Sequence, residues 1–407
     1  MDNKYENHFL MNKETVKEYC VEYLKYFDKD EELESQEIGD GNINYVFKVI
    51  GKQSGKSIVI KQADKFLRSS GRPLDLYRNK IEAEILRIEG TLAPSFVPKI
   101  YNYNEDMFAL SMEDISEYKN LRKELLDGKT FDHFAENIST FLAKTLLPST
   151  DLIMDRHEKK ERVRLFTNIE LCDISEDLVF TEPYYNYQDR NIITKGTEAF
   201  VTQYLYNDEE LKAEVGALRN NFMNNAQALI HGDLHSGSIF INEKGLKVID
   251  PEFAFYGPMG YDIGNVIGNL FFALVNKECV EPTQDKFIQW IKQAIIETFD
   301  LTMNKINDVY DHEVVFPLYK NGFKKEYLDS IIADSIGCAG TEIVRRTVGD
   351  SKVAEVNLVE NPEVRIKLDK ILIQLGIRLI KERKQIKSGK ELMKVFEEVI
   401  EEYGNEG

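Results

Sequence analysis

The chain lacks the features that mark secreted, membrane-spanning and nucleic-acid-binding proteins. Its four cysteines are scattered along 407 residues, with neither the spacing of a zinc site nor a disulfide framework. No run of eighteen apolar residues offers a membrane span, and the first residues contain no apolar signal core. The formal net charge is -18, whereas nucleic acids and anionic membranes need a basic surface. We therefore expect a cytoplasmic protein with reduced thiols and with no nucleic acid or membrane as its partner.

Length and apolar content predict a globular chain of more than one domain. The 407 residues include 43% apolar side chains, enough for two or three domains. An expected helix over residues 12–27 precedes several β-prone runs, and helical patterns dominate from about residue 116. We predict an α+β, bilobal fold with a β-rich N-terminal lobe at residues 1–115 and a mostly helical C-terminal lobe at residues 116–407. Residues 151–220 contain no motif from which a chemistry can be derived.

Two acidic residues, Asp233 and Asp250, flank a predicted β-hairpin. Residues 238–241 and 246–249 are short β-prone runs, and the Asn-Glu-Lys-Gly stretch at 242–245 is a turn between them. Because an antiparallel hairpin returns the chain to its starting end, we expect the two carboxylates to lie close together. Such a pair suits a site for a divalent metal and a phosphate group.

The sequence around both carboxylates resembles the catalytic and metal-binding loops of the kinase-like phosphotransferases. Residues 231–235 read His-Gly-Asp-Leu-His, the form found in small-molecule kinases. The resemblance implies that Asp233 orients or deprotonates the acceptor hydroxyl and that Asp250 binds Mg²⁺. Ser238 stands where the relatives carry an Asn metal ligand, and Glu252 stands where protein kinases carry Gly. Since a hydroxyl is a poorer Mg²⁺ ligand than an amide carbonyl, Glu252 is the candidate for the missing oxygen.

The same resemblance implies an ATP site in the first lobe. Residues 38–49 contain a Gly-Asp-Gly turn before an alternating strand, which suits a backbone cradle over phosphates. Lys61 lies near the end of a strand over residues 57–62 and matches the lysine that reaches the α and β phosphates. Glu82, on the following predicted helix, would pair with this lysine. The backbone of residues 113–115 would hydrogen-bond the adenine edge.

The segment after Asp250 favours a small acceptor over a protein. A helical run follows almost at once, whereas a protein kinase uses a longer segment there to dock a peptide. We expect Asp262 to cap this helix or to brace the catalytic loop. His231 and His235 are expected to support the loop rather than to act as base or metal ligand.

Two adjacent arginines, Arg345 and Arg346, lie near the end of a long helical pattern that begins around residue 325. One interpretation is favourable positive charge at a helix C-terminus. The other is neutralisation of a moving phosphoryl group or contact with a sugar hydroxyl.

Over most of its length the sequence resembles the 5-methylthioribose kinases, ATP-dependent enzymes of methionine salvage. The resemblance covers residues 39–44, 166–180, 250–258, the Ser238 loop and the twin arginines. It implies that Asp233 is the catalytic base at the anomeric hydroxyl of 5-methylthioribose and that Arg345 and Arg346 contact this substrate. It also implies ATP as cosubstrate with Mg²⁺ held by Asp250 and Glu252, and a homodimer. The nucleotide would be held by Asn44, Lys61, Glu82, Glu113, Asp114, Ile115, Asp250, Pro251 and Glu252.

Two alternatives share this set of residues. A kinase acting on an aminoglycoside, choline or homoserine has the same skeleton, but its usual Asn in place of Ser238 argues against it. A nucleotide-binding pseudokinase is disfavoured because Lys61, Glu82, Asp233 and Asp250 are all present.

Overall fold

The computed structural model describes residues 4–38, 44–65 and 75–404. The chain forms two compact units. Unit 1 comprises the chain up to Tyr118 together with Lys247–Phe253, and unit 2 comprises Lys119–Leu246 and the chain from Ala254 onward. Unit 1 contains the large sheet and unit 2 is mostly helical, which confirms the predicted α+β class. The Gly-Asp-Gly turn predicted to cradle phosphates falls on residues 39–41, outside the described residues.

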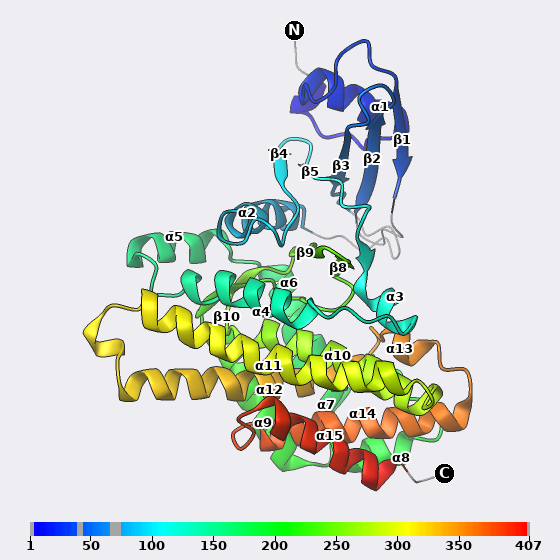
Figure 1. The fold of residues 1–407 in the computed structure, drawn as a ribbon, viewed down its shortest axis with the longest axis vertical. Coiled ribbons are helices and arrows are strands. Elements are labelled where there is room, and N and C mark those ends of the chain that lie inside the picture. Colours follow the sequence, from blue (N-terminus) through cyan, green and yellow to red (C-terminus); the bar gives the residue numbers. More distant parts are fainter. Residues whose placement is uncertain (1–3, 39–43, 66–74, 405–407) are drawn as a thin grey trace. The chain divides into compact units, whose positions relative to one another are not determined.

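Unit 1 is built around an antiparallel sheet (Figure 1). Among the described residues its five strands lie in the order β1 (Leu33–Glu37), β2 (Tyr45–Gly51), β3 (Ser57–Gln62), β5 (Ala109–Met112) and β4 (Ile100–Asn104). The β2–β3 hairpin pairs Tyr45 with Gln62 and Ile50 with Ser57. Its turn contains Gly55 at φ +67°, a left-handed conformation that glycine adopts without a steric penalty. This hairpin sets the register that places Lys61 near the end of β3.

Helical segments accompany the sheet in unit 1. They are η1 (Lys4–Glu6), α1 (Lys13–Glu18), η2 (Tyr19–Tyr23) and α2 (Tyr77–Leu92). Asn12 caps α1 by accepting the backbone N–H groups of Glu14 and Thr15. The helix predicted over residues 12–27 ends early, at Tyr23, because Lys25 takes the left-handed conformation at φ +55°. The segment packs into one apolar core with β2 and β3, as expected for a helix on the smaller lobe.

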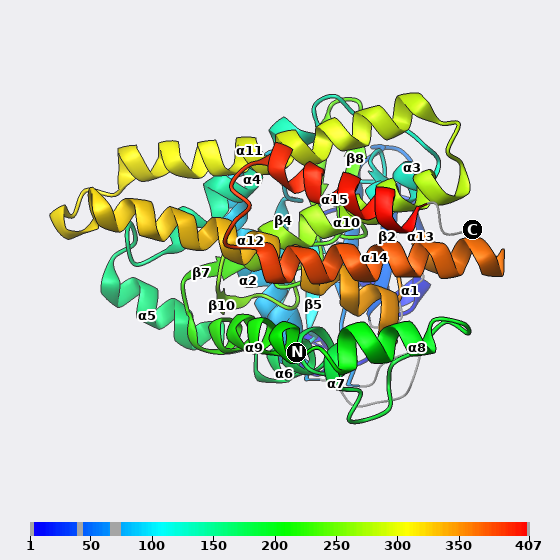
Figure 2. The ribbon, with the colours of Figure 1, turned by 90° about the horizontal axis from the view of Figure 1, so that it is seen from below.

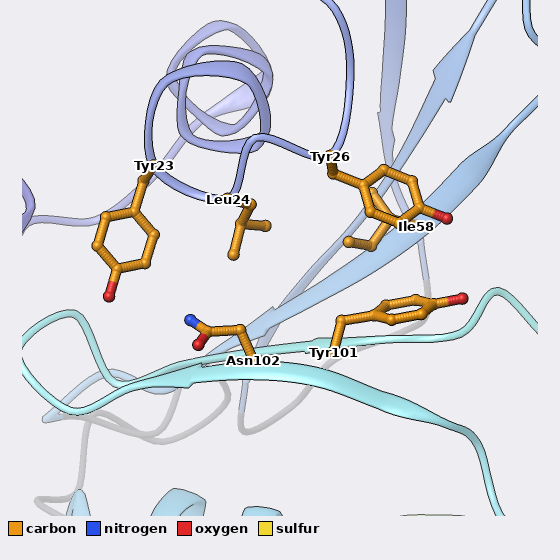
Figure 3. Close-up of a pocket in the computed structure, with 6 residues that line it drawn as sticks. All are labelled: Tyr23, Leu24, Tyr26, Ile58, Tyr101 and Asn102. Carbon is orange, nitrogen blue, oxygen red and sulfur yellow. The ribbon is translucent and has the colours of Figure 1, made fainter.

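A cavity of about 320 Å³ opens in unit 1 between the Tyr23–Tyr26 stretch and β4 (Figure 3). It is lined by Tyr23, Leu24, Tyr26, Ile58, Tyr101 and Asn102. Successive side chains on a strand point to opposite faces, so Ile58 and Lys61, three positions apart on β3, lie on opposite faces of the sheet. The cavity is therefore separate from the surface that carries Lys61.

Unit 2 is dominated by helices. In chain order they are α3 (Leu121–Leu126), α4 (Phe134–Thr145), η3 (Leu147–Ser149), α5 (Arg156–Leu165), α6 (Ile169–Phe180), α7 (Glu182–Tyr185), α8 (Glu198–Val201), η4 (Thr202–Tyr206), α9 (Glu209–Asn224), α10 (Gly260–Val280), α11 (Asp285–Glu313), η5 (Pro317–Tyr319), α12 (Gly322–Val348), α13 (Ala354–Asn357), α14 (Pro362–Glu382) and α15 (Gly389–Tyr403). Residues 151–220, which carry no motif, fold into α5 to α9 and the loops between them. Within the described chain, no helix has both the length and the apolar character needed to cross a bilayer.

Short strands carry the central motif. They are β6 (Lys119–Asn120), β7 (Ala228–Ile230), β8 (Ile239–Asn242), β9 (Gly245–Val248) and β10 (Phe255–Gly257), in sheets of order β6-β8-β9 and β10-β7. The predicted hairpin is confirmed as β8 and β9. The Asn242 side chain closes its turn by accepting the N–H groups of Lys244 and Gly245.

Glycines let the central helices of unit 2 approach closely. Helix α10 packs against α12, and α12 packs against α14 (Figure 2). A Cβ atom on Gly264 of α10 would lie 2.4 Å from the carbonyl oxygen of Ser335, and one on Gly340 of α12 would lie 2.5 Å from that of Gly376. Both distances are too short for any side chain. Glycine at these positions therefore allows α12, the helix that carries the twin arginines, to pack closely against α10 and α14.

Candidate functional site

Lys61 and Glu82 form the ion pair that the sequence predicts in unit 1. The Lys61 ammonium lies 2.7 Å from a carboxylate oxygen of Glu82 on α2 and also contacts Asp250, and its side chain is only 8% exposed. Burial alone would lower the pKa of Lys61, but the charges of Asp250 and Glu82 raise it above its usual value. The lysine is therefore a fixed, buried positive charge.

Asp250 and Glu252 complete an acidic cluster with Glu82. Each of the three offers one carboxylate oxygen, and these oxygens lie within 4.8 Å of one another. Asp250 takes φ +68°, uncommon for a residue other than glycine and typical of a side chain held for function. Burial, followed by the charge of Asp250, raises the pKa of Glu252, and burial raises that of Glu82 to about 7 although Lys61 opposes it. Three crowded carboxylates fit a hard divalent cation such as Mg²⁺.

Arg78 is a residue of this cluster that the sequence analysis missed. It is 1% exposed, and its guanidinium lies 3.4 Å from Glu252 and donates to the Asn44 side chain at 3.0 Å. Asn44 in turn donates to Glu252 at 3.4 Å. The sequence does place Arg78 four residues before Glu82, a spacing that puts both side chains on the same face of α2.

The segment predicted to hold adenine has other partners within unit 1. The backbone N–H of Glu113 donates to the carbonyl oxygen of Lys99 at 2.9 Å. The carboxylate of Asp114 pairs with Lys48 at 2.7 Å. The adenine-binding role of Glu113, Asp114 and Ile115 stays a prediction, as does that of Pro251, which is buried.

In unit 2 the loop of residues 231–235 is braced by Asp262 of α10. Asp262 accepts the backbone N–H groups of His231 at 2.7 Å and Gly232 at 3.0 Å, and Gly232 has φ +82°. Of the two roles expected for Asp262, bracing the loop is confirmed, while the capping role is wrong because Met259 stands at the cap position. His231 supports the loop as expected, since its Nδ1 accepts the backbone N–H of Asp233 at 3.3 Å.

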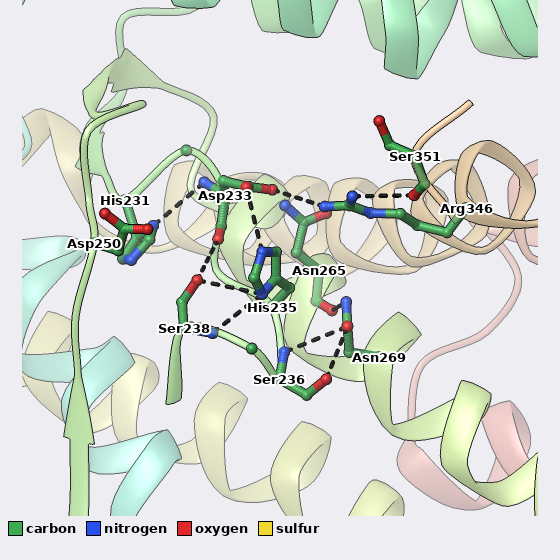
Figure 4. Close-up of polar contacts among 12 residues, drawn as sticks. His231, Asp233, His235, Ser236, Ser238, Asp250, Asn265, Asn269, Arg346 and Ser351 are labelled. Carbon is green, nitrogen blue, oxygen red and sulfur yellow. Dashed lines mark hydrogen bonds and ion pairs between the residues drawn. The ribbon is translucent and has the colours of Figure 1, made fainter. Parts of the chain in front are cut away.

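Asp233 lies among positive and polar groups (Figure 4). Its Oδ1 accepts from Nη2 of Arg345 at 3.1 Å and of Arg346 at 3.2 Å, and its Oδ2 lies 3.4 Å from Nε2 of His235. Burial alone would raise the pKa of Asp233, but His235, Arg346 and Arg345 lower it well below its usual value. Asp233 is therefore ionised at neutral pH and can accept hydrogen bonds from a hydroxyl.

The side chain of Ser238, at the position where related loops carry a metal-binding Asn, is directed at the loop of residues 231–235. Its hydroxyl donates to the carbonyl oxygen of Asp233 at 3.2 Å, and its backbone N–H donates to Nδ1 of His235 at 3.1 Å. The residue therefore stabilises the loop conformation on which Asp233 is carried.

Arg345 and Arg346 contact the loop that carries Asp233 from the last turn of α12. Their side chains are 10% and 12% exposed, and both contact Asp233, so they are more than solvated charges at a helix end. Glu342, one turn earlier, contacts both arginines and was missed. The spacing of an acid three and four residues before two arginines was the available signal. Because Asp233 and Asp250 belong to different units, their expected closeness stays a prediction.

Comparison with known proteins agrees with this arrangement. Residues 159–290 match the model of the phosphotransferase enzyme family. A methylthioribose kinase of Geobacillus sp. (strain WCH70) is 37% identical over 380 residues, covering 93% of each chain. That of Exiguobacterium sibiricum is 39% identical over 365 residues, covering 88% of this chain and 90% of the relative. A choline kinase structure from Cryptosporidium parvum matches in fold, with TM-score 0.50 at 14% identity over 92% of this chain and all of that one.

The kinase-like fold, the buried Lys61–Glu82 pair and the braced Asp233 loop define a small-molecule phosphotransferase of the kinase-like group. The two methylthioribose kinases are 37% and 39% identical to this chain over 93% and 88% of its length. The chain therefore belongs to the methylthioribose kinase family.

Proposed function

We propose that the protein transfers the γ-phosphoryl group of ATP to the anomeric hydroxyl of 5-methylthio-D-ribose, giving 5-methylthioribose 1-phosphate and ADP in methionine salvage. The observation that carries this proposal is the cluster in which Arg345 and Arg346 both donate to Oδ1 of Asp233. The names of its relatives supply the substrate, and the cluster supplies a base and the positive charge that phosphoryl transfer requires.

Asp233 acts in this proposal as the group that orients and deprotonates the acceptor. An anomeric hydroxyl is part of a hemiacetal and is more acidic than an ordinary alcohol, so it needs a less strong base, and a carboxylate can accept its proton as the new O–P bond forms. His235, Arg346 and Arg345 keep the carboxylate ionised, so that it can accept a hydrogen bond from the hydroxyl. Positioning and charge neutralisation supply most of the rate enhancement in such reactions.

Unit 1 is proposed to be the ATP-binding lobe, with residues 1–115 as its core. Lys61, held by Glu82, would contact the phosphates, and Asn44 would lie beside them. Asp250 and Glu252 would hold Mg²⁺, which offsets the negative charge of the phosphates when it is bound. The role of residues 113–115 at adenine belongs to the same proposal.

The test is an ATP-consumption assay with purified protein and a panel of acceptors. The panel contains 5-methylthioribose, ribose, choline, homoserine and an aminoglycoside, each at several concentrations. We expect turnover with 5-methylthioribose, with a much lower kcat/KM for ribose because the methylthio contacts are lost. Activity confined to choline, homoserine or the aminoglycoside would overturn the substrate assignment.

A homodimer and a cytoplasmic location complete the proposal. An apolar group at the turn between α11 and α12 supports self-association, because Val315, Phe316 and Leu318 are 79%, 52% and 74% exposed. Sedimentation of the wild-type protein and of a Phe316→Ser, Leu318→Ser variant checks the dimer. A monomeric wild-type protein at micromolar concentration would contradict it.

A further inference from the structure

Glu342 is a fully buried carboxylate that lies behind both arginines of the site. Its side chain is 0% exposed, and its carboxylate accepts from Nε of Arg345 and, at 3.2 Å, from Nε of Arg346. The same guanidinium groups reach Asp233 through their Nη2 atoms. Each arginine therefore donates to Glu342 through its Nε atom and to Asp233 through its Nη2 atom.

The position of Glu342 is fixed by a second helix. Asn269 of α10 donates from Nδ2 to Oε1 of Glu342 at 3.0 Å, and its Oδ1 accepts the Ser236 hydroxyl at 3.1 Å and Arg122 at 3.0 Å. A Cβ atom on Gly268 would lie 3.3 Å from that of Glu342, so this glycine allows the close approach. Through Asn269 and Ser236 the carboxylate is connected to the same loop that carries Asp233.

The two positive charges of Arg345 and Arg346 explain why Glu342 is needed in addition to Asp233. Two guanidinium groups that donate to one oxygen atom repel each other, and Asp233 alone offsets one positive charge. Glu342 offsets the other, which leaves the group of four neutral. Burial would lower the pKa of Arg345, but the charge of Glu342 raises it, and burial would raise the pKa of Glu342, but Arg345 and Arg346 lower it. Glu342 and Arg345 therefore stay ionised.

We propose that Glu342 is a positioning residue that aims both arginines at Asp233 and at the transferred phosphoryl group, and that limits how tightly the site binds anions. The inference rests on the proposed function, because it assigns a role within the acceptor site. Without this carboxylate the arginines carry one uncompensated positive charge and lose the contact that orients their Nη2 atoms. The site then retains phosphate-bearing ligands more tightly and turns over more slowly.

The experiment compares Glu342→Gln and Glu342→Asp with the wild-type enzyme. In Glu342→Gln we expect kcat to fall at least about tenfold, with KM for ATP within about twofold. Displaced arginine side chains slow the phosphoryl-transfer step more than they weaken nucleotide binding. Inorganic phosphate, used as a probe in calorimetry, should bind several-fold more tightly to this variant, since a negative charge beside the site is gone. Glu342→Asp keeps the charge but shortens the reach, so wild-type phosphate affinity should return while kcat stays reduced.

Asp369→Asn is the matched control. Asp369 on α14 is also buried and pairs with Arg365 four residues earlier at 2.8 Å, with Thr194 as a further partner. We expect its kcat and phosphate affinity to stay within about twofold of wild type, because it is not in the Asp233 cluster.

The outcomes separate the two proposals. A wild-type enzyme inactive on 5-methylthioribose refutes the proposed function, whereas phosphate binding still tests Glu342 without any turnover. A folded Glu342→Gln variant with unchanged kcat and unchanged phosphate affinity overturns the positioning role. If Glu342→Gln fails to fold, as judged by circular dichroism, Glu342→Asp decides: wild-type kcat refutes the inference, and a reduced kcat with wild-type phosphate affinity supports it.

Discussion

Replacing Asp233 with Asn tests the centre of the proposed mechanism. Asn has nearly the same size as Asp, and its carbonyl oxygen can still accept from Arg345 and Arg346, which lie 3.1 and 3.2 Å from Oδ1. The substitution therefore removes the negative charge and the ability to accept a proton, and it leaves the shape of the loop in place. A positioned general base contributes about 10²- to 10⁴-fold. Loss of this factor raises the activation free energy by about 3–5 kcal/mol.

Stability should change much less than rate. The Asp233 side chain is 23% exposed, so the unbalanced charge of the arginines is partly solvated. Hydrogen bonds to charged groups contribute about 1.5–3 kcal/mol, and Asn retains part of them. We expect a loss of roughly 1–2 kcal/mol, seen as a small decrease in Tm, with a normal circular dichroism spectrum.

The assay measures ADP release at saturating ATP and 5-methylthioribose, together with ATP affinity by calorimetry in the absence of acceptor. Asp233→Asn should lower kcat by about two to four orders of magnitude and leave the Kd for ATP within about threefold, since the residues proposed to bind the nucleotide belong to unit 1. Asp369→Asn again serves as the control for loss of a buried carboxylate. Turnover within tenfold of wild type would remove Asp233 from the role of base.

Three further changes test other parts of the molecule. Glu252→Gln should weaken ATP binding about tenfold in a Mg²⁺ titration and leave metal-free ATP binding nearly unchanged, because an oxygen with full charge is lost from the acidic cluster; an unaltered titration returns Glu252 to a structural role. Gly264→Ala should lower the free energy of unfolding by about 1–3 kcal/mol, measured in urea, since its Cβ atom would meet the Ser335 carbonyl oxygen at 2.4 Å; an unchanged midpoint would contradict this close approach. Burial raises the pKa of Asp334 from 3.8 to about 6, so the folded state binds the carboxyl proton more tightly than the unfolded state does. The stability that this proton contributes is fully present below pH 3.8 and is lost as the pH rises through about 6. Asp334→Asn should remove this loss, so the free energy of unfolding of the variant should rise relative to that of wild type by at most about 3 kcal/mol between pH 4 and pH 7. Parallel profiles of unfolding free energy against pH would refute the raised pKa.

Local patterns in the sequence predicted the parts of the site that depend on neighbours along the chain. The β8–β9 hairpin follows from two β-prone runs and an Asn-Glu-Lys-Gly turn, and the Lys61–Glu82 pair follows from a strand, a helix and their order. Arg78 and Glu342 were not predicted, because helical spacing shows which charged residues share a face of a helix but not that this face is buried against other elements. Likewise, the early end of the N-terminal helix depends on the conformation of Lys25, which apolar spacing does not report.

The acidic cluster of unit 1 carries more negative than positive charge. Glu82, Asp250 and Glu252 face two cations, Lys61 and Arg78, so one negative charge remains when all are ionised. Burial of such an excess is costly unless a cation joins it. The divalent cation proposed for Asp250 and Glu252 would offset this excess charge.

The acceptor side has the opposite requirement, and this bears on which acceptor fits. Arg345 and Arg346 are matched by Asp233 and Glu342, so the buried cluster is neutral before an acceptor arrives. A neutral sugar can hydrogen-bond to Asp233 without disturbing that balance. Choline and aminoglycosides are cations, and we expect the two nearby guanidinium groups to disfavour them relative to a neutral sugar. We expect removal of one arginine, as in Arg346→Met, to raise the ratio of choline to 5-methylthioribose binding.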